Sequence, residues 1–265
     1  MPPSASPADV SSQKRQTARA NHKIALDAVQ KAERPEGGAG RRFLFDVSGP
    51  RPAGPEPVMF PDLARDDVFR LETRRFWLRW PRVADAPAIT RYSSRREVAE
   101  KTARIPHPYP PGEAERYIFT ARAANAEGRN LTLAIAPTGD RRDVIGMISL
   151  EGRRQGRLTL GYALAPEWWG RGVMTEAARA VIDAAFSLTL AVEIFANTRV
   201  GNVASRRVLE KCGFAHTGAG LEGAPARGGM VESDRFRLDR NAWNGLLAGR
   251  NAHAPATSIA SGDAP

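Results

Sequence analysis

Cysteine is nearly absent from this chain, with one residue, Cys212, among 265. A single thiol supports neither an internal disulfide framework nor a cysteine-based zinc cluster. The sequence therefore indicates a cytoplasmic setting rather than an oxidising one, and we expect no metal.

Long hydrophobic runs are also missing. No apolar stretch approaches the roughly 20 residues that a membrane helix needs. The first 20 residues, MPPSASPADVSSQKRQTARA, lack the apolar segment of a secretory signal. We therefore expect a soluble protein with no membrane partner.

Acidic residues are outnumbered, because 29 Asp and Glu face 39 Lys and Arg, giving a formal net charge of +10. Such a charge would suit nucleic acid, an acidic partner or a polyphosphate ligand. The arginines are scattered through segments with folding patterns, and they form no basic run interleaved with aromatic residues. Nucleic acid is therefore not expected to be the main ligand.

The composition divides the chain into three parts. Residues 1–67 form a low-complexity basic extension, rich in Pro, Gly, Ser, Ala and Arg, with one helical candidate at 21–34. Residues 68–248 carry ordered patterns and are expected to form one domain. Residues 249–265 are predicted to be a disordered tail.

The first half of the domain predicts a strand, helices and a meander. RRFWLRWP, at 74–81, has the aromatic content of a first strand, and VADAPAITRYSS follows as a short helix. Two further helical segments flank the break IPHPYPPG, which must be a loop because neither helix can enter it. LTLAIA, VIGMISL and RLTLGYAL then predict three successive antiparallel strands.

The second half predicts strand, helix, strand and helix, which we expect to close the domain. From 173 to 188 the apolar residues recur on one helical stripe, made of Val173, Ala177, Val181 and Ala185. LAVEIFA, at 190–196, predicts the next strand. NVASRRVLEKCGF predicts a second helix, with Asn202 as its N-cap and Gly213 as its C-terminal stop.

The segment WWGRGVMTEA joins a predicted strand to a predicted helix. Glycines at 170 and 172 allow a turn that exposes successive backbone N–H groups at the helix N-terminus, and such a nest binds phosphate. The alternative is a glycine-containing connection with no ligand.

LGYALAPEWWGRGVMTEA followed by NVASRRVLEKCGF resembles the GNAT acetyltransferase superfamily, in particular its ribosomal-protein N-terminal (alanine) acetyltransferase branch. The resemblance covers about residues 72–240. It implies an α/β fold with a mixed, mainly antiparallel sheet flanked by helices. The sheet would splay between its fourth and fifth strands, LGYAL and AVEIFA, and leave a slot for acetyl-CoA.

The resemblance also implies the cofactor contacts. The superfamily motif Gln/Arg-x-x-Gly-x-Gly/Ala falls on residues 169–174, where Trp169 and Met174 depart from it. The backbone from Arg171 to Thr175 would hold the pyrophosphate, and the strand near Ala163 and Leu164 would pair with the pantetheine arm. The implied acetyl-CoA-binding residues are Ala163, Leu164, Trp169, Gly170, Arg171, Gly172, Val173, Met174, Thr175, Asn202 and Ser205.

Ser205 is the candidate catalytic residue, because it matches a serine that some members place near the cofactor sulfur. The tyrosine that other members use four positions later is Leu209 here. The alternative for Ser205 is a local hydrogen bond within the first helical turn. No base is assigned, because strand glutamates such as Glu151 and Glu193 usually face solvent and His107 lies between prolines in a loop.

The missing base favours a weakly basic acceptor. An α-amino group has a pKa near 8, whereas lysine lies near 10.4, so lysine is harder to deprotonate at neutral pH. We expect N-acetylation of an amine acceptor, in particular a protein or peptide α-amine, by a monomer or a homodimer. The alternatives are a small-molecule amine (antibiotic, polyamine or amino acid) acetyltransferase and a non-catalytic CoA-binding protein.

Overall fold

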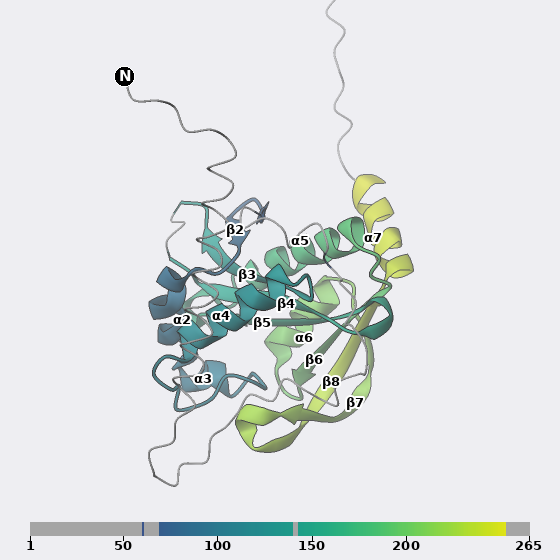
Figure 1. Cartoon of the computed structure of the whole chain (residues 1–265). Helices are drawn as coiled ribbons and strands as arrows, with labels where there is room; N and C mark the ends of the chain where they lie inside the picture. The colour runs from purple at the N-terminus through teal and green to yellow at the C-terminus, as the bar shows by residue number, and fades with distance from the viewer. Residues whose placement is uncertain (1–59, 61–68, 140–142, 253–265) are drawn as a thin grey trace, which may run out of the picture. The chain divides into compact units, whose positions relative to one another are not determined.

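The computed structural model describes residues 60, 69–139 and 143–252. The predictions for the remainder of the extension and for the tail from 253 onward lie outside these residues. Figure 1 shows the described elements along the chain. Their order is β1 (Arg70–Glu72), β2 (Phe76–Arg79), α2 (Ala86–Ser93), α3 (Arg96–Ala99), α4 (Glu113–Ala126), β3 (Asn130–Pro137), β4 (Gly146–Gly152), β5 (Arg157–Leu164), α5 (Val173–Leu188), β6 (Glu193–Arg199), α6 (Val203–Lys211), β7 (Ala215–Ala224), β8 (Gly229–Asp239) and α7 (Arg240–Ala252).

The strands form a mixed sheet in the order β1-β2-β3-β4-β5-β6-β8-β7, which confirms the α/β class and the mainly antiparallel sheet. Neighbours pair antiparallel except β5 and β6. This parallel ladder is short, running from Arg157↔Glu193 to Thr159↔Phe195. Beyond it β5 continues to Leu164 and β6 to Arg199.

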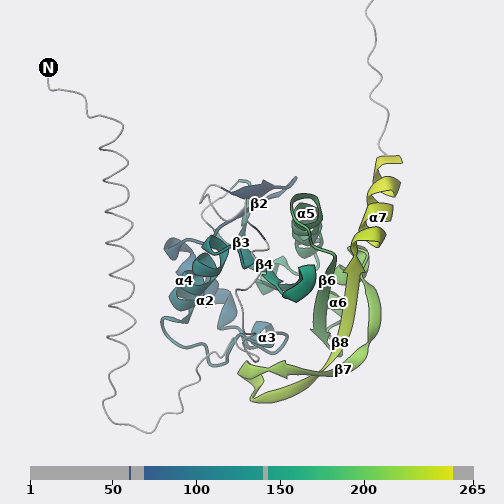
Figure 2. The same cartoon turned by 45° about the vertical axis from the view of Figure 1, so that its right-hand side comes forward.

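Helices cover both faces of the sheet, as Figure 2 shows. One apolar cluster joins α2 and α4 to Ala134, Met147 and Ala163 of the strands. A larger cluster joins α5, the end of α6 and Trp243 of α7 to the other face. Successive residues of β5 point to opposite faces, so Leu164 packs in the larger cluster and Ala163 in the smaller one.

Helix α5 packs as its sequence pattern predicts. The four residues of the apolar stripe are each at most 1% exposed, namely Val173, Ala177, Val181 and Ala185. Complete burial of such a stripe is what stabilises a helix of this length in water. The stripe fixes the helix on the sheet and thereby fixes where its N-terminus lies.

The prediction that the second helix closes the domain is wrong. Strands β7 and β8 and helix α7 follow it, and β8 pairs with β6 along seven residue pairs, from Glu193↔Asp239 to Arg199↔Ser233. β7 reads AHTGAGLEGA, and its glycines and small residues have low strand propensity. Pairing with β8 overrides that local preference, which no local pattern reveals.

Phe60 belongs to the core although it lies within the segment assigned to the extension. Its side chain is 1% exposed and packs in the larger cluster, and its backbone N–H donates to the Gly128 carbonyl at 3.0 Å. Among the described residues, none of the helices combines the length and apolarity needed to cross a bilayer.

Candidate functional site

The turn before α5 has the backbone that the glycines predict. Gly170 and Gly172 have φ angles of 72° and 71°, in the left-handed region that favours glycine. Gly172 is the N-cap of α5, and no side chain caps the helix there. The first N–H groups of an α-helix have no intrahelical acceptor, so this end of α5 offers several donors together with the positive end of the helix dipole.

Trp169, which departs from the superfamily motif, fastens this turn to the sheet. Its indole Nε1 donates to the Leu164 carbonyl at the end of β5, at 2.8 Å. The Lys101 ammonium lies 4.1 Å from the centre of the Trp169 rings. The indole N–H therefore supplies a polar anchor for the turn, and the ring takes a cation from the loop after α3.

Arg75, between β1 and β2, binds the same turn from the other side. Its backbone N–H and its Nε donate to the two Glu176 carboxylate oxygens at 2.9 and 2.7 Å, and its Nη1 donates to the Arg171 carbonyl at 3.0 Å. Partial burial raises the pKa of Glu176, but hydrogen bonds from Arg75 and Thr73 outweigh it, so the pKa lies below its usual range. Glu176 is therefore a carboxylate at neutral pH.

At the end of β5, the backbone polar groups of Tyr162 and Leu164 face the side on which β6 diverges from β5. The Ala165 N–H donates to the Ile145 carbonyl, next to β4, at 2.8 Å. The Ala163 carbonyl oxygen points to the same side, since it would lie 2.6 Å from a Cβ atom placed on Gly146 of β4. Backbone polar groups alternate along a strand, so those of Ala163 face β4 and those of Tyr162 and Leu164 face away from it.

Asn202, Ser205 and Tyr162 form a hydrogen-bonded group beside this edge. Asn202 is the N-cap of α6, as predicted, and its Oδ1 accepts the Ser205 N–H at 3.3 Å. The Ser205 hydroxyl lies 2.9 Å from the Tyr162 hydroxyl across the gap between α6 and β5. Burial raises the pKa of Tyr162 well above its usual value, against a smaller lowering effect from Ser205.

Tyr162 is a residue of this hydrogen-bonded group that the sequence alone did not single out. The tyrosine position of the superfamily is held by Leu209, which is 1% exposed and packs in the core. Instead, the phenol that contacts Ser205 of α6 is that of Tyr162 in β5. The signal was present in the alternation of RLTLGYAL, where a hydroxyl-bearing side chain takes a core-facing position among leucines.

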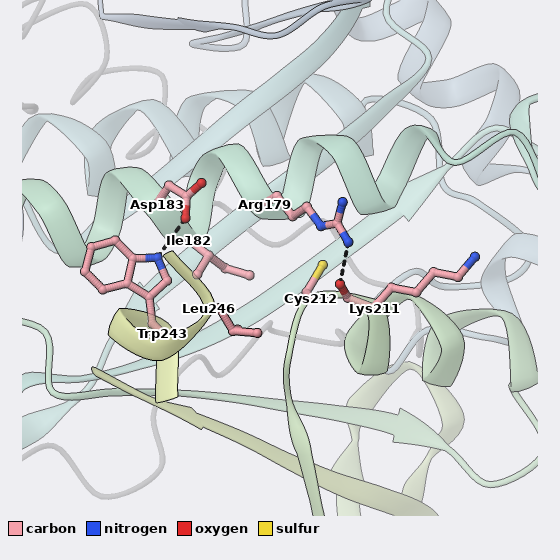
Figure 3. A pocket seen from close by; sticks show the side chains of 7 residues that line it. All are labelled: Arg179, Ile182, Asp183, Lys211, Cys212, Trp243 and Leu246. Carbon is pink, nitrogen blue, oxygen red and sulfur yellow. Dashed lines mark hydrogen bonds between the residues drawn. The ribbon is translucent and has the colours of Figure 1, made fainter. Parts of the chain in front are cut away.

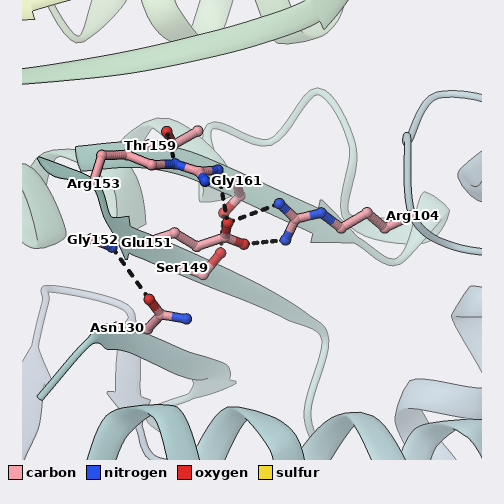
Figure 4. A network of polar contacts seen from close by, with 8 residues as sticks. All are labelled: Arg104, Asn130, Ser149, Glu151, Gly152, Arg153, Thr159 and Gly161. Carbon is pink, nitrogen blue, oxygen red and sulfur yellow. Dashed lines mark hydrogen bonds and ion pairs between the residues drawn. The ribbon is translucent and has the colours of Figure 1, made fainter. Parts of the chain in front are cut away.

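On the other face of the sheet, Glu151 is paired with two arginines, as Figure 4 shows. Both Nη atoms of Arg104 donate to the carboxylate, Nη2 to Oε2 at 2.8 Å. Arg153 Nη2 donates to the same Oε2 at 3.3 Å. Glu193 is likewise paired, with Arg157 at 2.5 Å. Neither glutamate faces only solvent, because each carboxylate is ion-paired with arginine.

The loop after α3 is held by the β7–β8 connection. The Ala226 N–H donates to the Ala103 carbonyl at 3.1 Å, and the Arg227 guanidinium donates to the Ile105 carbonyl. From the end of β6, Arg199 donates to the Glu100 carbonyl at 2.5 Å. This loop therefore forms a fixed wall on the Glu151 side, and His107 is exposed beyond it.

Cys212 is a packing residue, being 6% exposed with its thiol 3.8 Å from the Thr175 carbonyl. It lines a small cavity of about 170 Å³ between α5 and α7, shown in Figure 3. There Asp183 accepts from the Trp243 indole at 2.7 Å, and Arg179 donates to the Lys211 carbonyl at 2.7 Å. The first contact joins α5 to α7, and the second joins α5 to the end of α6. Among the described residues, no group of His, Cys, Asp and Glu could hold a metal ion.

Curated relatives match part of the chain. YdaF of Bacillus subtilis, assigned by its name to the ribosomal N-acetyltransferases, is 32% identical over 102 residues, which are 38% of this chain and 56% of YdaF. The chain spans between 39% and 56% of the length of the curated relatives it matches.

Solved structures share the fold. The RimJ protein of Mycobacterium smegmatis in complex with CoA-disulfide has a TM-score of 0.54 at 21% identity, over 68% of this chain and 94% of RimJ. The ribosomal-protein-S5-alanine acetyltransferase of Vibrio fischeri has a TM-score of 0.55 at 21% identity, over 66% of this chain and 98% of that one.

Residues 75–215 match the family described as "Acetyltransferase (GNAT) domain". This match spans more than half of the chain and includes the glycine turn, Tyr162 and Ser205. The chain therefore belongs to the GNAT acetyltransferases.

Proposed function

We propose that this protein is an acetyl-CoA-dependent N-acetyltransferase whose acceptor is the α-amine of a protein or peptide. The observation that carries the proposal is the pair of left-handed glycines ahead of α5, beside the point where β5 and β6 cease to pair. Amide donors at a helix N-terminus next to an unpaired strand edge suit a ligand with phosphates at one end and amides along its arm.

The residues present fit CoA. The amides from Arg171 to Thr175 would bind the pyrophosphate, and Arg171 adds an exposed cation at the same turn. The resemblance implied pairing of the pantetheine arm near Ala163 and Leu164, but the backbone groups of Ala163 face β4. The backbone of Tyr162 and the N–H of Leu164 would pair with the pantetheine amides instead, and the Leu164 carbonyl accepts from Trp169. Bound acetyl-CoA supplies the acetyl group as a thioester.

Ser205 and Tyr162 would supply the proton that the departing thiolate needs. A tyrosine phenol is protonated at neutral pH, and burial raises the pKa of Tyr162 further, so its hydroxyl can donate to Ser205 at 2.9 Å. The Ser205 hydroxyl, aligned by that contact, would donate in turn to the sulfur. Asn202 holds the first turn of α6 that carries the serine.

An α-amine is the acceptor that this site suits. Glu151 and Glu193 are engaged by arginines and are poorly placed to take a proton from an ammonium group. Without a strong base, neutralising lysine at neutral pH costs about 3 to 4 kcal/mol, whereas an α-amine costs roughly 1 kcal/mol. The names of YdaF and of the Vibrio fischeri enzyme also favour a ribosomal-protein acceptor.

The test is CoA release from acetyl-CoA with matched acceptors. One peptide is offered with a free α-amine and no lysine, and its partner has a blocked N-terminus and one lysine. Spermidine and a free amino acid complete the panel. We expect turnover with the peptide that has the free α-amine and with none of the other three acceptors. Turnover only with lysine or with a small amine would refute the acceptor, and CoA binding without turnover of any acceptor would favour a non-catalytic role.

A further inference from the structure

We propose that Arg75 is a phosphate-binding residue of the acetyl-CoA site and contacts the pyrophosphate. The inference rests on the proposed function. Arg75 lies in the turn between β1 and β2, outside the glycine motif and 96 residues from Arg171, whose carbonyl it binds. It brings a second cation to the turn from a separate part of the sheet.

The geometry leaves one edge of the Arg75 guanidinium directed at the turn. Nε donates to Glu176 and Nη1 donates to the Arg171 carbonyl. Within the described part of the chain, no atom accepts a hydrogen bond from Nη2. A Cβ built on Gly172 would lie 3.6 Å from this Nη2. The remaining donors therefore lie beside the N-cap residue whose neighbouring amides would hold the phosphates.

The charges explain why an arginine is needed there. Glu176 lies in the first turn of α5, where the helix dipole attracts either a carboxylate or a phosphate. An unpaired carboxylate at this position would repel a bound pyrophosphate. Arg75 neutralises it, and a guanidinium can serve a carboxylate and a phosphate at once because its five donors lie in one plane.

The arginine is also held in position before any ligand arrives. Its backbone N–H and side chain bind the same carboxylate, and its guanidinium carbon lies 5.0 Å from the centre of the Phe76 ring. Its side chain is 38% exposed, so solvent and ligands can reach it. A side chain already ordered loses little further entropy on binding, which favours affinity.

A role limited to fastening the turn is the competing explanation, and four variants of the full chain separate the two. Arg75→Gln removes the cation, and Arg75→Lys keeps the charge but loses the planar fork. Glu176→Gln breaks the ion pair and leaves Arg75 charged. Arg74→Gln removes an exposed neighbouring charge and serves as the matched control. Binding of CoA and of dephospho-CoA, which lacks the 3′-phosphate, is measured by calorimetry at low and high salt.

We expect Arg75→Gln to raise the Kd of both CoA and dephospho-CoA about 10-fold or more, as loss of one charge-assisted hydrogen bond implies. It should also reduce the salt dependence of binding. Arg75→Lys should recover part of the affinity, and Arg74→Gln should stay within about twofold of the wild type. Glu176→Gln keeps an amide oxygen that can accept from Arg75, so it should lose less affinity than Arg75→Gln. Unfolding is monitored for each variant, so that a loss of folded protein is not read as a loss of affinity.

Three results would overturn the inference and leave the proposed function standing. Equal losses in Arg75→Gln and Glu176→Gln would show that Arg75 only fastens the turn. A loss confined to CoA, with dephospho-CoA unaffected, would assign Arg75 to the 3′-phosphate instead of the pyrophosphate. Unchanged affinity in Arg75→Gln would exclude any contact. Failure of the wild-type chain to bind either ligand would overturn the proposed function itself, and this inference with it.

Discussion

Removal of the Ser205 hydroxyl tests the chemistry of the site most directly. The hydroxyl contacts Tyr162 at 2.9 Å, and the amide of the same residue is bound separately by Asn202 at 3.3 Å. Ser205→Ala therefore deletes the contact across the gap and leaves the helix cap in place. Tyr162→Phe deletes the same contact from the other side.

The expected cost to stability is small. A single hydrogen bond between partly buried hydroxyls contributes about 0.5 to 1.5 kcal/mol to the free energy of unfolding. Tyr162→Phe leaves the ring packed, and Ser205→Ala removes one atom from a half-buried position. The free energy of unfolding of each variant should thus lie within about 1.5 kcal/mol of the wild-type value. Urea unfolding of the free protein measures this term.

The expected cost to turnover is larger. If Ser205 donates the proton to the thiolate, Ser205→Ala should lower kcat about 10- to 1000-fold, within or just below the usual range for general acid catalysis. The Kd for CoA should barely change. Tyr162→Phe should lower kcat less, and the double variant should be no slower than Ser205→Ala, because the two hydroxyls act in series.

The assay is CoA release at saturating acetyl-CoA with an acceptor that the wild type uses. Ser149→Ala is the matched control, since its hydroxyl makes only a 3.5 Å contact to the Gly161 carbonyl near the Glu151 network. An undiminished kcat in Ser205→Ala would refute the acid role. Additive losses in the double variant would refute the coupling of the two hydroxyls.

Three further outcomes are expected. Gly172→Val should abolish most of the rise in Tm that CoA causes, because a β-branched residue cannot readily adopt a φ of 71°, whereas Gly229→Val should retain it; an equal rise in both variants would contradict the placement of the phosphates. Phe60→Ala should lower the free energy of unfolding, measured in urea, by about 3 to 5 kcal/mol, as for other buried phenylalanines. Deletion of 1–59 should preserve cooperative unfolding and CoA binding. A small effect of Phe60→Ala together with a large effect of the deletion would refute this boundary. The pKa of Glu176 is lowered by folding, so its stabilising effect is present above its ordinary value of 4.5 and is lost as the pH falls below it; Glu176→Gln should therefore show a shallower loss of Tm on acidification, and parallel profiles would refute the linkage.

Local patterns predicted the elements whose stabilising contacts are close in sequence. The stripe of α5 and the N-cap at Asn202 depend on residues within a few positions of one another, and both are confirmed. The same holds for the glycine turn, where the conformation of Gly170 and Gly172 follows from the residue type. The turn could therefore be found from the sequence before any tertiary contact was known.

The rest of the site depends on contacts between distant parts of the chain. Arg75 meets Glu176 across 101 positions, and neither residue differs in type from the many exposed charges around it. The identity of Glu151 as a paired carboxylate depends on Arg104, 47 positions away. Such pairings arise from strand order and helix placement, which the periodicity of one segment does not encode. Tyr162 alone could have been found from the alternation of its own strand.

The order in which the site forms during synthesis follows from the contact between the β7–β8 connection and the loop after α3. Arg227 lies 122 positions beyond Ile105, so the wall on the Glu151 side stays open until 51 residues have been added after Glu176. At the usual pace of translation this interval lasts about 3 to 10 s. A nascent chain should thus acquire the partners of its glycine turn first and close the wall on the Glu151 side last.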